Sequence, residues 1–299
     1  MDDIRVTFLG TSSASPTLAR NVASLAVTLD GRVLLFDCGE GTQQQLLRST
    51  VRSGSIDAIF ITHLHGDHFF GLPGLLATLG LNARSAPLTI YGPPGLAPFL
   101  DAVPYLGNPY EISVAVVGEG EVMRGEGFKV IAAPLDHRIE CFGFCVVEDD
   151  RRGTFDVDRA LSLGVPEGPQ FAQLHRGDDV VLDDGRVVRS ADVVGATRRG
   201  RRIAYCTDTR PCANAISLAR DAELLIHEST YAADMAAEAH ERGHATTVEA
   251  AHVAAEAKCE RLLLTHFSSR YVDVAPLVDE ARAIFPATDA AADFMTVRV

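Results

Sequence analysis

The segment His63-Leu64-His65-Gly66-Asp67-His68, which directly follows the apolar run 56–62, decides the fold expected of this chain. Two imidazoles separated by one residue cannot share a helix face, but they point the same way in an extended or turning segment. Asp67 and His68 add an oxygen and a nitrogen in the next turn. Four potential ligands exceed what one zinc ion normally takes from one loop. The spacing therefore predicts two metal ions about 3.5–4 Å apart, with His63 and His65 on one ion and Asp67 and His68 on the other.

These ions need further ligands, and the rest of the chain offers them at the ends of short apolar segments. Five such segments end in a stretch that carries His or Asp, namely His63–His68, His137, Asp208, His227 and His266. Because strand ends on one edge of a sheet converge on a crevice, side chains distant in sequence can meet there. His137, Asp208 and His266 are the best candidates for the missing ligands. A carboxylate has two oxygens, which makes Asp208 the natural bridge between the ions.

The pattern of apolar residues predicts an α/β chain of short strands with helices between them. Asp30-Gly31 is a strong two-residue hairpin signal. Helices are expected at 71–81 and in the Ala- and Glu-rich stretch 247–258. Strands are expected at 4–9, 24–29, 32–36, 56–62, 88–91, 128–133, 141–145, 203–206, 223–226 and 262–264.

The composition is that of a soluble globular protein with a sizeable core. The 299 residues are 47% hydrophobic and 22% charged. They contain no apolar run of about 18 residues, so no membrane span is expected. The start, Met1-Asp2-Asp3-Ile4-Arg5, has neither the basic nor the apolar region of a secretory signal, which predicts a cytoplasmic location. The six cysteines form no Cys-x-x-Cys pair, which argues against a disulfide framework.

The charge and the middle of the chain bear on possible nucleic-acid binding. A formal net charge of −13 argues against binding through bulk positive charge, although a local basic patch or metal ions could still bind nucleic acid. The stretch 148–197 reads as an inserted lobe, with a Gly- and Pro-rich turn at 164–169 and a second hairpin signal at Asp184-Gly185. Between 151 and 195 it holds six Arg against eight Asp or Glu, so this lobe is not a basic patch.

Several further motifs, in a consistent order, resemble one family. The histidine cluster is similar to the signature of the metallo-β-lactamase superfamily. The other motifs resemble ribonuclease Z, the family that trims the 3′ trailer from precursor tRNA, and the resemblance covers nearly the whole chain. These motifs are FLGTSS (8–13), PTLARN (16–21), FDCGEGTQ (36–43), HEST (227–230), GHAT (243–246) and THFSSRY (265–271).

This resemblance implies a four-layer αββα sandwich, forming a single metallo-β-lactamase domain over 1–299 with a flexible arm inserted at about 148–197. It implies an endoribonuclease that cuts precursor tRNA after the discriminator base, leaving a 3′-hydroxyl on the tRNA and a 5′-phosphate on the trailer. The expected cofactor is two Zn²⁺ per subunit, and Mn²⁺ or Fe²⁺ also suit these ligands. The expected partners are precursor tRNA and a second copy of the chain in a homodimer. In that dimer, one subunit's arm serves the other's active site.

The resemblance also assigns roles to single residues. It places His63, His65 and His137 on one ion and Asp67, His68 and His266 on the other, with Asp208 between them. Asp67 is also the proton acceptor for the attacking water. His244 and His227 lie near the scissile phosphate, where one of them assists the departing 3′-oxygen. Arg270 contacts a phosphate, and Asp37 either orients a ligand histidine or caps a turn.

One position departs from the family pattern, and two other interpretations stay open. Leu18 stands where the family often has lysine, in a loop associated with rejecting tRNA that already carries the CCA end. The missing lysine removes the basis for expecting that discrimination. The acidic chain favours a first alternative, a two-metal phosphodiesterase or arylsulfatase-like hydrolase of small molecules. The second is a non-catalytic RNA-binding protein with a closed structural metal site.

Overall fold

The computed structural model describes residues 3–103 and 109–299, and it divides the chain into two compact units. The first unit is formed by the chain up to Val147 together with Arg202–Val299. The second unit is Glu148–Arg201, and the insertion expected at about 148–197 lies inside it.

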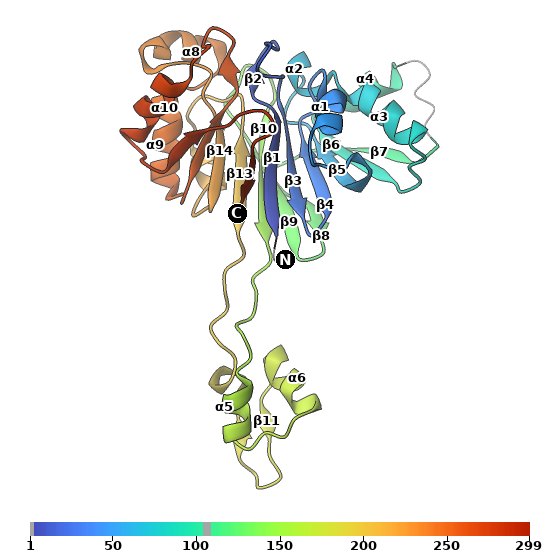
Figure 1. The fold of residues 1–299 in the computed structure, drawn as a ribbon, viewed down its shortest axis with the longest axis vertical. Helices are drawn as coiled ribbons and strands as arrows, with labels where there is room; N and C mark the ends of the chain where they lie inside the picture. The colour runs from blue at the N-terminus through green and yellow to red at the C-terminus, as the bar shows by residue number, and fades with distance from the viewer. Residues whose placement is uncertain (1–2, 104–108) are drawn as a thin grey trace. The chain divides into compact units, whose positions relative to one another are not determined.

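The first unit contains two seven-stranded sheets that lie face to face (Figure 1). Apolar side chains of both sheets, among them Phe8, Phe36 and Phe144, fill the layer between them. The strand order of one sheet is β18 (Thr296–Arg298), β1 (Ile4–Gly10), β3 (Ser24–Leu29), β4 (Arg32–Phe36), β5 (Ile56–Phe60), β6 (Leu88–Gly92) and β7 (Ile112–Val116). That of the other is β17 (Thr288–Ala290), β15 (Leu262–Thr265), β14 (Leu224–Glu228), β13 (Arg202–Cys206), β10 (Phe142–Glu148), β9 (Phe128–Pro134) and β8 (Gly120–Gly125).

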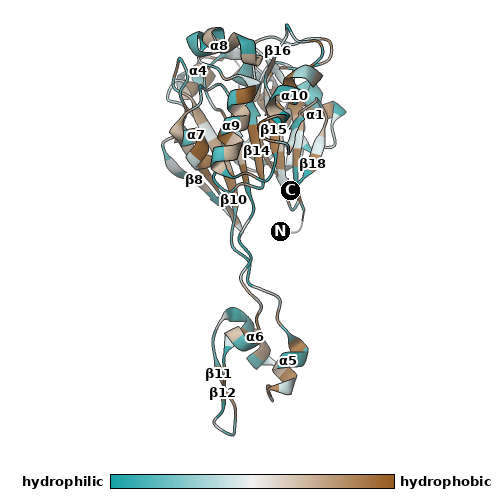
Figure 2. Cartoon of the chain, turned by 90° about the vertical axis from the view of Figure 1, so that its left-hand side faces the viewer, coloured by the Kyte–Doolittle hydropathy of each residue, from teal (hydrophilic) through white to brown (hydrophobic). Residues whose placement is uncertain are grey.

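Helices cover the outer face of each sheet and complete the four layers of an αββα sandwich. Apolar residues of α1 (Thr42–Arg48), α3 (Leu72–Leu81) and α4 (Leu96–Asp101) form one outer core with the first sheet. Those of α7 (Ala213–Leu218), α9 (Thr247–Ala257) and α10 (Ala275–Arg282) form another with the second. Figure 2 shows the apolar strands β14 and β15 beside helices whose surfaces mix polar and apolar residues. The remaining elements of this unit are α2 (Gly66–Phe69), α8 (Ala236–Arg242), the 3-10 turns Ser53–Ser55 and Ala233–Met235, and the pair β2 (Ser12–Ser13) and β16 (Phe267–Ser268).

The predicted strands agree closely with the observed ones where local turn chemistry fixes them. β3 and β4 have the predicted bounds, because Asp30 and Gly31 both adopt positive φ (46° and 88°) in their two-residue turn. β10, predicted at 141–145, runs on to Glu148, and β14, predicted at 223–226, runs on to Glu228. In β14 the reason is its pairing. Parallel pairing with β13 and β15 continues through His227 and Glu228 and extends the strand beyond its apolar residues.

The second unit is small and has its own core. It consists of α5 (Val157–Ser162), α6 (Pro169–Arg176), a 3-10 turn at Ser190–Asp192 and the hairpin β11 (Val180–Val181) to β12 (Val187–Val188). Asp184-Gly185 makes the hairpin turn, with Gly185 at φ 82°. Its apolar core is formed by Ala160, Val165, Leu174, Val180, Leu182, Val188 and Val193.

The sheets of the first unit bring the predicted ligand segments together. β4, β5 and β6 run parallel in one sheet, and β13, β14 and β15 run parallel in the other. The segments after β5, β9, β13 and β15 carry the histidine cluster, His137, Asp208 and His266 respectively. In the part of the chain that the structure describes, no helix has the length and apolar character needed to cross a membrane.

Candidate metal centre

The predicted ligands meet in two adjoining groups at these strand ends. The ligand atoms of the first group, and likewise those of the second, lie within 4.8 Å of one another. The first group is His63, His65, His137 and Asp208, and the second is Asp67, His68 and His266. All seven residues therefore converge although they come from four separate segments of the chain.

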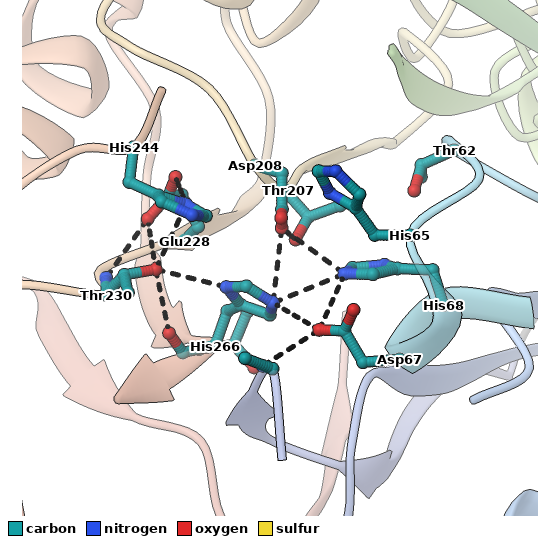
Figure 3. A network of polar contacts seen from close by, with 12 residues as sticks. Thr62, His65, Asp67, His68, Thr207, Asp208, Glu228, Thr230, His244 and His266 are labelled. Carbon is teal, nitrogen blue, oxygen red and sulfur yellow. Dashed lines mark hydrogen bonds and ion pairs between the residues drawn. The ribbon is translucent and has the colours of Figure 1, made fainter. Parts of the chain in front are cut away.

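Asp208 joins the two groups through its two carboxylate oxygens (Figure 3). Oδ2 lies 3.4 Å from His63 Nε2 and 3.9 Å from His137 Nε2. Oδ1 lies 3.4 Å from His68 Nε2 and 3.2 Å from His266 Nε2. Each oxygen thus faces a different group, as a carboxylate shared by two ions requires. Burial alone would raise the pKa of Asp208, but the surrounding histidines hold it well below its usual value.

The ring nitrogens of the three histidines in the first group face one another at short range. His137 Nδ1 donates to the carbonyl of Gly243 over 2.7 Å, which leaves a lone pair on its Nε2. That Nε2 lies 3.2 Å from His65 Nδ1, which is itself 3.0 Å from His63 Nε2. Burial also lowers the pKa of all three rings, which keeps them neutral. Neutral nitrogens aimed at one point are the donors that a divalent metal ion takes, so these residues fit such an ion.

Asp37 holds the second group in place from behind. It accepts hydrogen bonds from Thr62, from the Tyr205 hydroxyl over 3.0 Å and from His68 Nδ1 over 2.8 Å. The His68 ring is thereby turned so that Nε2 faces Asp67 and Asp208. Of the two roles expected for Asp37, the contacts fit the orientation of a ligand histidine. Tyr205 lies outside the motifs of the sequence, and its role as a partner of Asp37 emerges only from the structure.

Close backbone contacts fix the histidine segment against the loop after β4. Cys38 N donates to His68 O over 2.7 Å, and Gly71 N donates to Cys38 O. A Cβ on Gly39 would lie 2.1 Å from the Asp67 carbonyl oxygen, so only glycine allows this approach. Asp208 and His266 both adopt left-handed backbone, at φ 44° and 58°. Such a conformation costs about 1 kcal/mol or more per residue and is typical of functional sites.

His244 lies beside the second group and is paired with a glutamate that the sequence analysis did not assign. Its Nδ1 donates to Glu228 Oε1 over 2.9 Å, and its ring lies near that of His266 with centroids 5.8 Å apart (Figure 3). Glu228 also accepts from Thr209 N and from Thr230, and it is completely buried. Burial opposes a charge on His244, but Glu228 and Asp208 outweigh it and raise the pKa of His244 to about 9. His244 is therefore a cation at neutral pH and can donate a proton.

β14 turns Glu228, and not His227, toward His244 and the metal ligands. Successive residues of a strand point to opposite faces, so Glu228 shares a face with Ile226 and His227 shares the other with Leu225. Ile226 packs between the sheets, whereas Leu225 packs under α7, α9 and α10. His227 is completely buried, and its Nε2 has no hydrogen-bond partner among the described residues. The alternation of side chains along residues 224–228 is the sequence signal that would have favoured Glu228 over His227 as the residue that faces the metal centre.

Arg270 and His244 both lie close to the ring of Tyr231. The Arg270 guanidinium lies 5.0 Å from the centre of the Tyr231 ring, and that ring lies 6.1 Å from the ring of His244. Glu238 and the sulfur of Met235 also contact the guanidinium. Arg270 is partly exposed, which leaves it able to meet a substrate.

A hollow of about 420 Å³ opens onto the metal ligands. Its lining includes the polar groups His65, Asp67, Asp208 and His244. It also includes the apolar groups Pro16, Val22 and Phe70. Ala14 N donates to Asp67 Oδ2 over 2.8 Å, which joins the loop after β2 to the metal ligands.

The fold and this donor set define a metallo-β-lactamase-fold protein with a divalent metal centre. Residues 189–267 match the model of the β-lactamase superfamily domain, and residues 4–100 match that of the anti-Pycsar protein Apyc1. The crystal structure of human tRNase Z, short form, superposes with a TM-score of 0.71 at 31% identity, covering 98% of both chains. A long-form RNase Z from yeast, at 19% identity, shares the fold with a TM-score of 0.67 over 42% of its own length.

Curated relatives narrow this class further. Ribonuclease Z of Acaryochloris marina is 47% identical, covering 99% of this chain and 98% of that protein. Ribonuclease Z of Gloeothece citriformis is 49% identical, covering 99% of this chain and 96% of that protein. Ribonuclease Z of Myxococcus xanthus is 47% identical, covering 94% of this chain and 93% of that protein. The chain therefore belongs to the ribonuclease Z family.

Proposed function

We propose that this chain is a zinc-dependent endoribonuclease that removes the 3′ trailer from precursor tRNA. It would leave a 3′-hydroxyl on the tRNA and a 5′-phosphate on the trailer. The observation that carries the proposal is the convergence of seven ligand residues, with Asp208 between the two groups, in a chain whose full length resembles ribonuclease Z. A cytoplasmic location belongs to the same proposal.

Two zinc ions would be held at the centre. His63, His65 and His137 would bind one, Asp67, His68 and His266 the other, and Asp208 both. Support comes from the ring nitrogens that face one another in the first group and from the two oxygens of Asp208. When bound, such ions activate water at neutral pH and stabilise charge on phosphoryl oxygens.

Asp67 would accept the proton of the attacking water. Burial alone would raise its pKa, but His68 and His266 hold the pKa well below its usual value, so the side chain is an unprotonated carboxylate. Ala14 N fixes the position of Oδ2. The water oxygen would form a bond to phosphorus while the bond from phosphorus to the tRNA 3′-oxygen breaks.

His244 would deliver a proton to that departing 3′-oxygen. Its raised pKa keeps it protonated at neutral pH, and Glu228 holds the ring in one orientation. Arg270 would contact a substrate phosphate near Tyr231. We assign His227 no role in this mechanism, because it lies on the opposite face of β14 from Glu228, which contacts His244.

The second unit would bind the body of the tRNA as a flexible arm. Arg152 and Arg189 line a hollow of about 700 Å³ on it, together with Asp179 and the glycines Gly177 and Gly195. We also propose a homodimer in which one subunit's arm serves the other's active site. Because few arginines are available, affinity should fall with salt on a shallow slope.

Cleavage of a labelled precursor tRNA tests the proposal. The full-length chain loaded with zinc should release the trailer, and a chain that lacks 150–195 should keep hydrolysing bis(p-nitrophenyl) phosphate while losing activity on the precursor. If the full-length chain hydrolyses the small diester and leaves the precursor intact, the function in tRNA processing is refuted and a small-molecule phosphodiesterase is favoured.

A further inference from the structure

Phe70 is a large apolar side chain that stays exposed at the metal centre. It directly follows α2 and keeps 58% of its surface exposed, although burying an aromatic ring is strongly favourable. It lines the same hollow as Asp67 and His244. The proposed chemistry of water activation and proton transfer leaves this ring without a role.

The Phe70 ring is fixed by what lies behind it. A Cβ on Gly66 would lie 2.3 Å from a ring carbon of Phe70, so the ring packs directly on the Gly66 backbone. Phe69 lies beside it with centroids 4.8 Å apart, and Phe99 stacks at 6.3 Å and 27°. Phe69 belongs to the core and meets Phe99 edge-on. A ring held in this way loses little conformational entropy when a flat partner binds.

The hollow is lined by both charged and apolar side chains. The metal ligands and His244 suit a phosphate, whereas Pro16, Val22 and Phe70 offer nothing that binds one. A nucleotide has both parts, since its base carries a flat π-face beside the phosphodiester. Exposed aromatic rings are the common platform for unpaired bases, and such stacking tolerates every base.

We propose that Phe70 is the stacking platform for the nucleobase next to the scissile bond. This inference rests on the proposed function, because it takes the substrate to be an RNA with an unpaired end. Stacking would hold that nucleotide so that its phosphate lies over the metal ligands, without selecting a base. Phe70 thereby acts as a substrate-binding residue rather than a participant in proton transfer.

Fluorescence of 2-aminopurine tests the stacking directly, because stacking quenches it. The probe is placed in precursor tRNA at the last nucleotide of the tRNA body or the first of the trailer. Zinc-loaded chain is mixed with it in a stopped-flow instrument, and the phase before cleavage is recorded. The wild type and Phe70→Tyr should quench one of the two probes, and Phe70→Leu should not. Leu47→Ala is the matched control, since Leu47 is 77% exposed on α1 and does not line the hollow.

Kinetics provide a second measurement. Phe70→Leu should lower kcat/KM for precursor tRNA by roughly ten- to a hundredfold, the value of one stacked base. An abasic nucleotide at the quenched position should slow the wild type by a similar factor and should slow Phe70→Leu little further. Metal content and Tm of the variant should match the wild type.

The possible outcomes separate this inference from the proposed function. The stacking is refuted if Phe70→Leu and the wild type quench the probe equally. It is also refuted if the abasic nucleotide slows cleavage by the same factor in both. If Phe70→Leu instead changes only the oligomeric state, the ring is a subunit contact and the inference is wrong. A wild type that quenches the probe but does not release the trailer would keep the stacking and refute the proposed activity.

Discussion

His244 and Glu228 form an ion pair of 2.9 Å between Nδ1 and Oε1, with the glutamate completely buried. Such a pair stays charged because each partner stabilises the other where water cannot reach. Glu228 is the last residue of β14, and His244 follows the glycine that ends α8, so the pair joins two elements at the metal centre. The pair raises the pKa of His244 above that of a free histidine, so the ring still carries its proton at neutral pH.

The first prediction concerns pH. Glu228→Gln removes the larger of the two charges that raise the pKa of His244 to about 9, so that pKa should fall. A general acid works below its pKa. The basic limb of the kcat profile for precursor tRNA should therefore move to lower pH. Glu256→Gln, a change at an exposed residue of α9, is the control. An unshifted basic limb in Glu228→Gln would exclude His244 as the acid.

The second prediction concerns the bridge. Because Asp208 faces both ligand groups, Asp208→Ala should reduce metal at both positions, whereas His137→Ala should affect chiefly the first. Elemental analysis should find about one zinc per chain in His137→Ala and less in Asp208→Ala, and trailer release by Asp208→Ala should fall by about a thousandfold or more. His252→Ala, an exposed change, should retain the full content. Equal zinc in the two ligand variants would contradict a shared carboxylate.

The third prediction concerns the residue behind the ligands. Tyr205→Phe deletes one of the hydrogen bonds that Asp37 accepts and leaves His68 less firmly oriented. Removing a residue that orients a metal ligand through hydrogen bonds typically lowers metal affinity by about ten- to a hundredfold. Zinc competition with a chelator should reveal such a loss. Tyr110→Phe is the matched control, since its hydroxyl bonds to Leu76 O in the outer core. Unchanged zinc affinity in Tyr205→Phe would remove Tyr205 from the site.

The fourth prediction concerns Leu18. This side chain is fully exposed in the loop that carries Pro16, and an apolar tip there offers no charge to the end of a tRNA. We expect the wild type to cleave precursors that contain CCA nearly as well as those without it. Leu18→Lys should slow cleavage of the CCA-bearing precursor several-fold while sparing the other. Competition between the two precursors in one reaction measures this ratio. If the wild type already discriminates, the loop acts without a lysine.

The fold was largely predictable because its signals are local. The Asp30-Gly31 hairpin follows from two residues that accept positive φ, and α3 and α9 follow from their composition. The ligand set was predictable for a related reason, since every ligand lies within a few residues of the end of an apolar strand. Short helices such as α7 and α8 escaped prediction because six or seven residues carry too little periodicity.

The sequence by itself determined which residues can bind metal, since His63–His68, His137, Asp208 and His266 are the donors at the strand ends. Only the tertiary structure decided which of their neighbours support them. It put Glu228, not His227, on the face of β14 toward the centre, and it brought the Tyr205 hydroxyl to Asp37 across 168 positions of sequence. It also left Phe70 exposed beside the ligands. These choices depend on which sheet face packs against which layer, and no local pattern of residues contains that information.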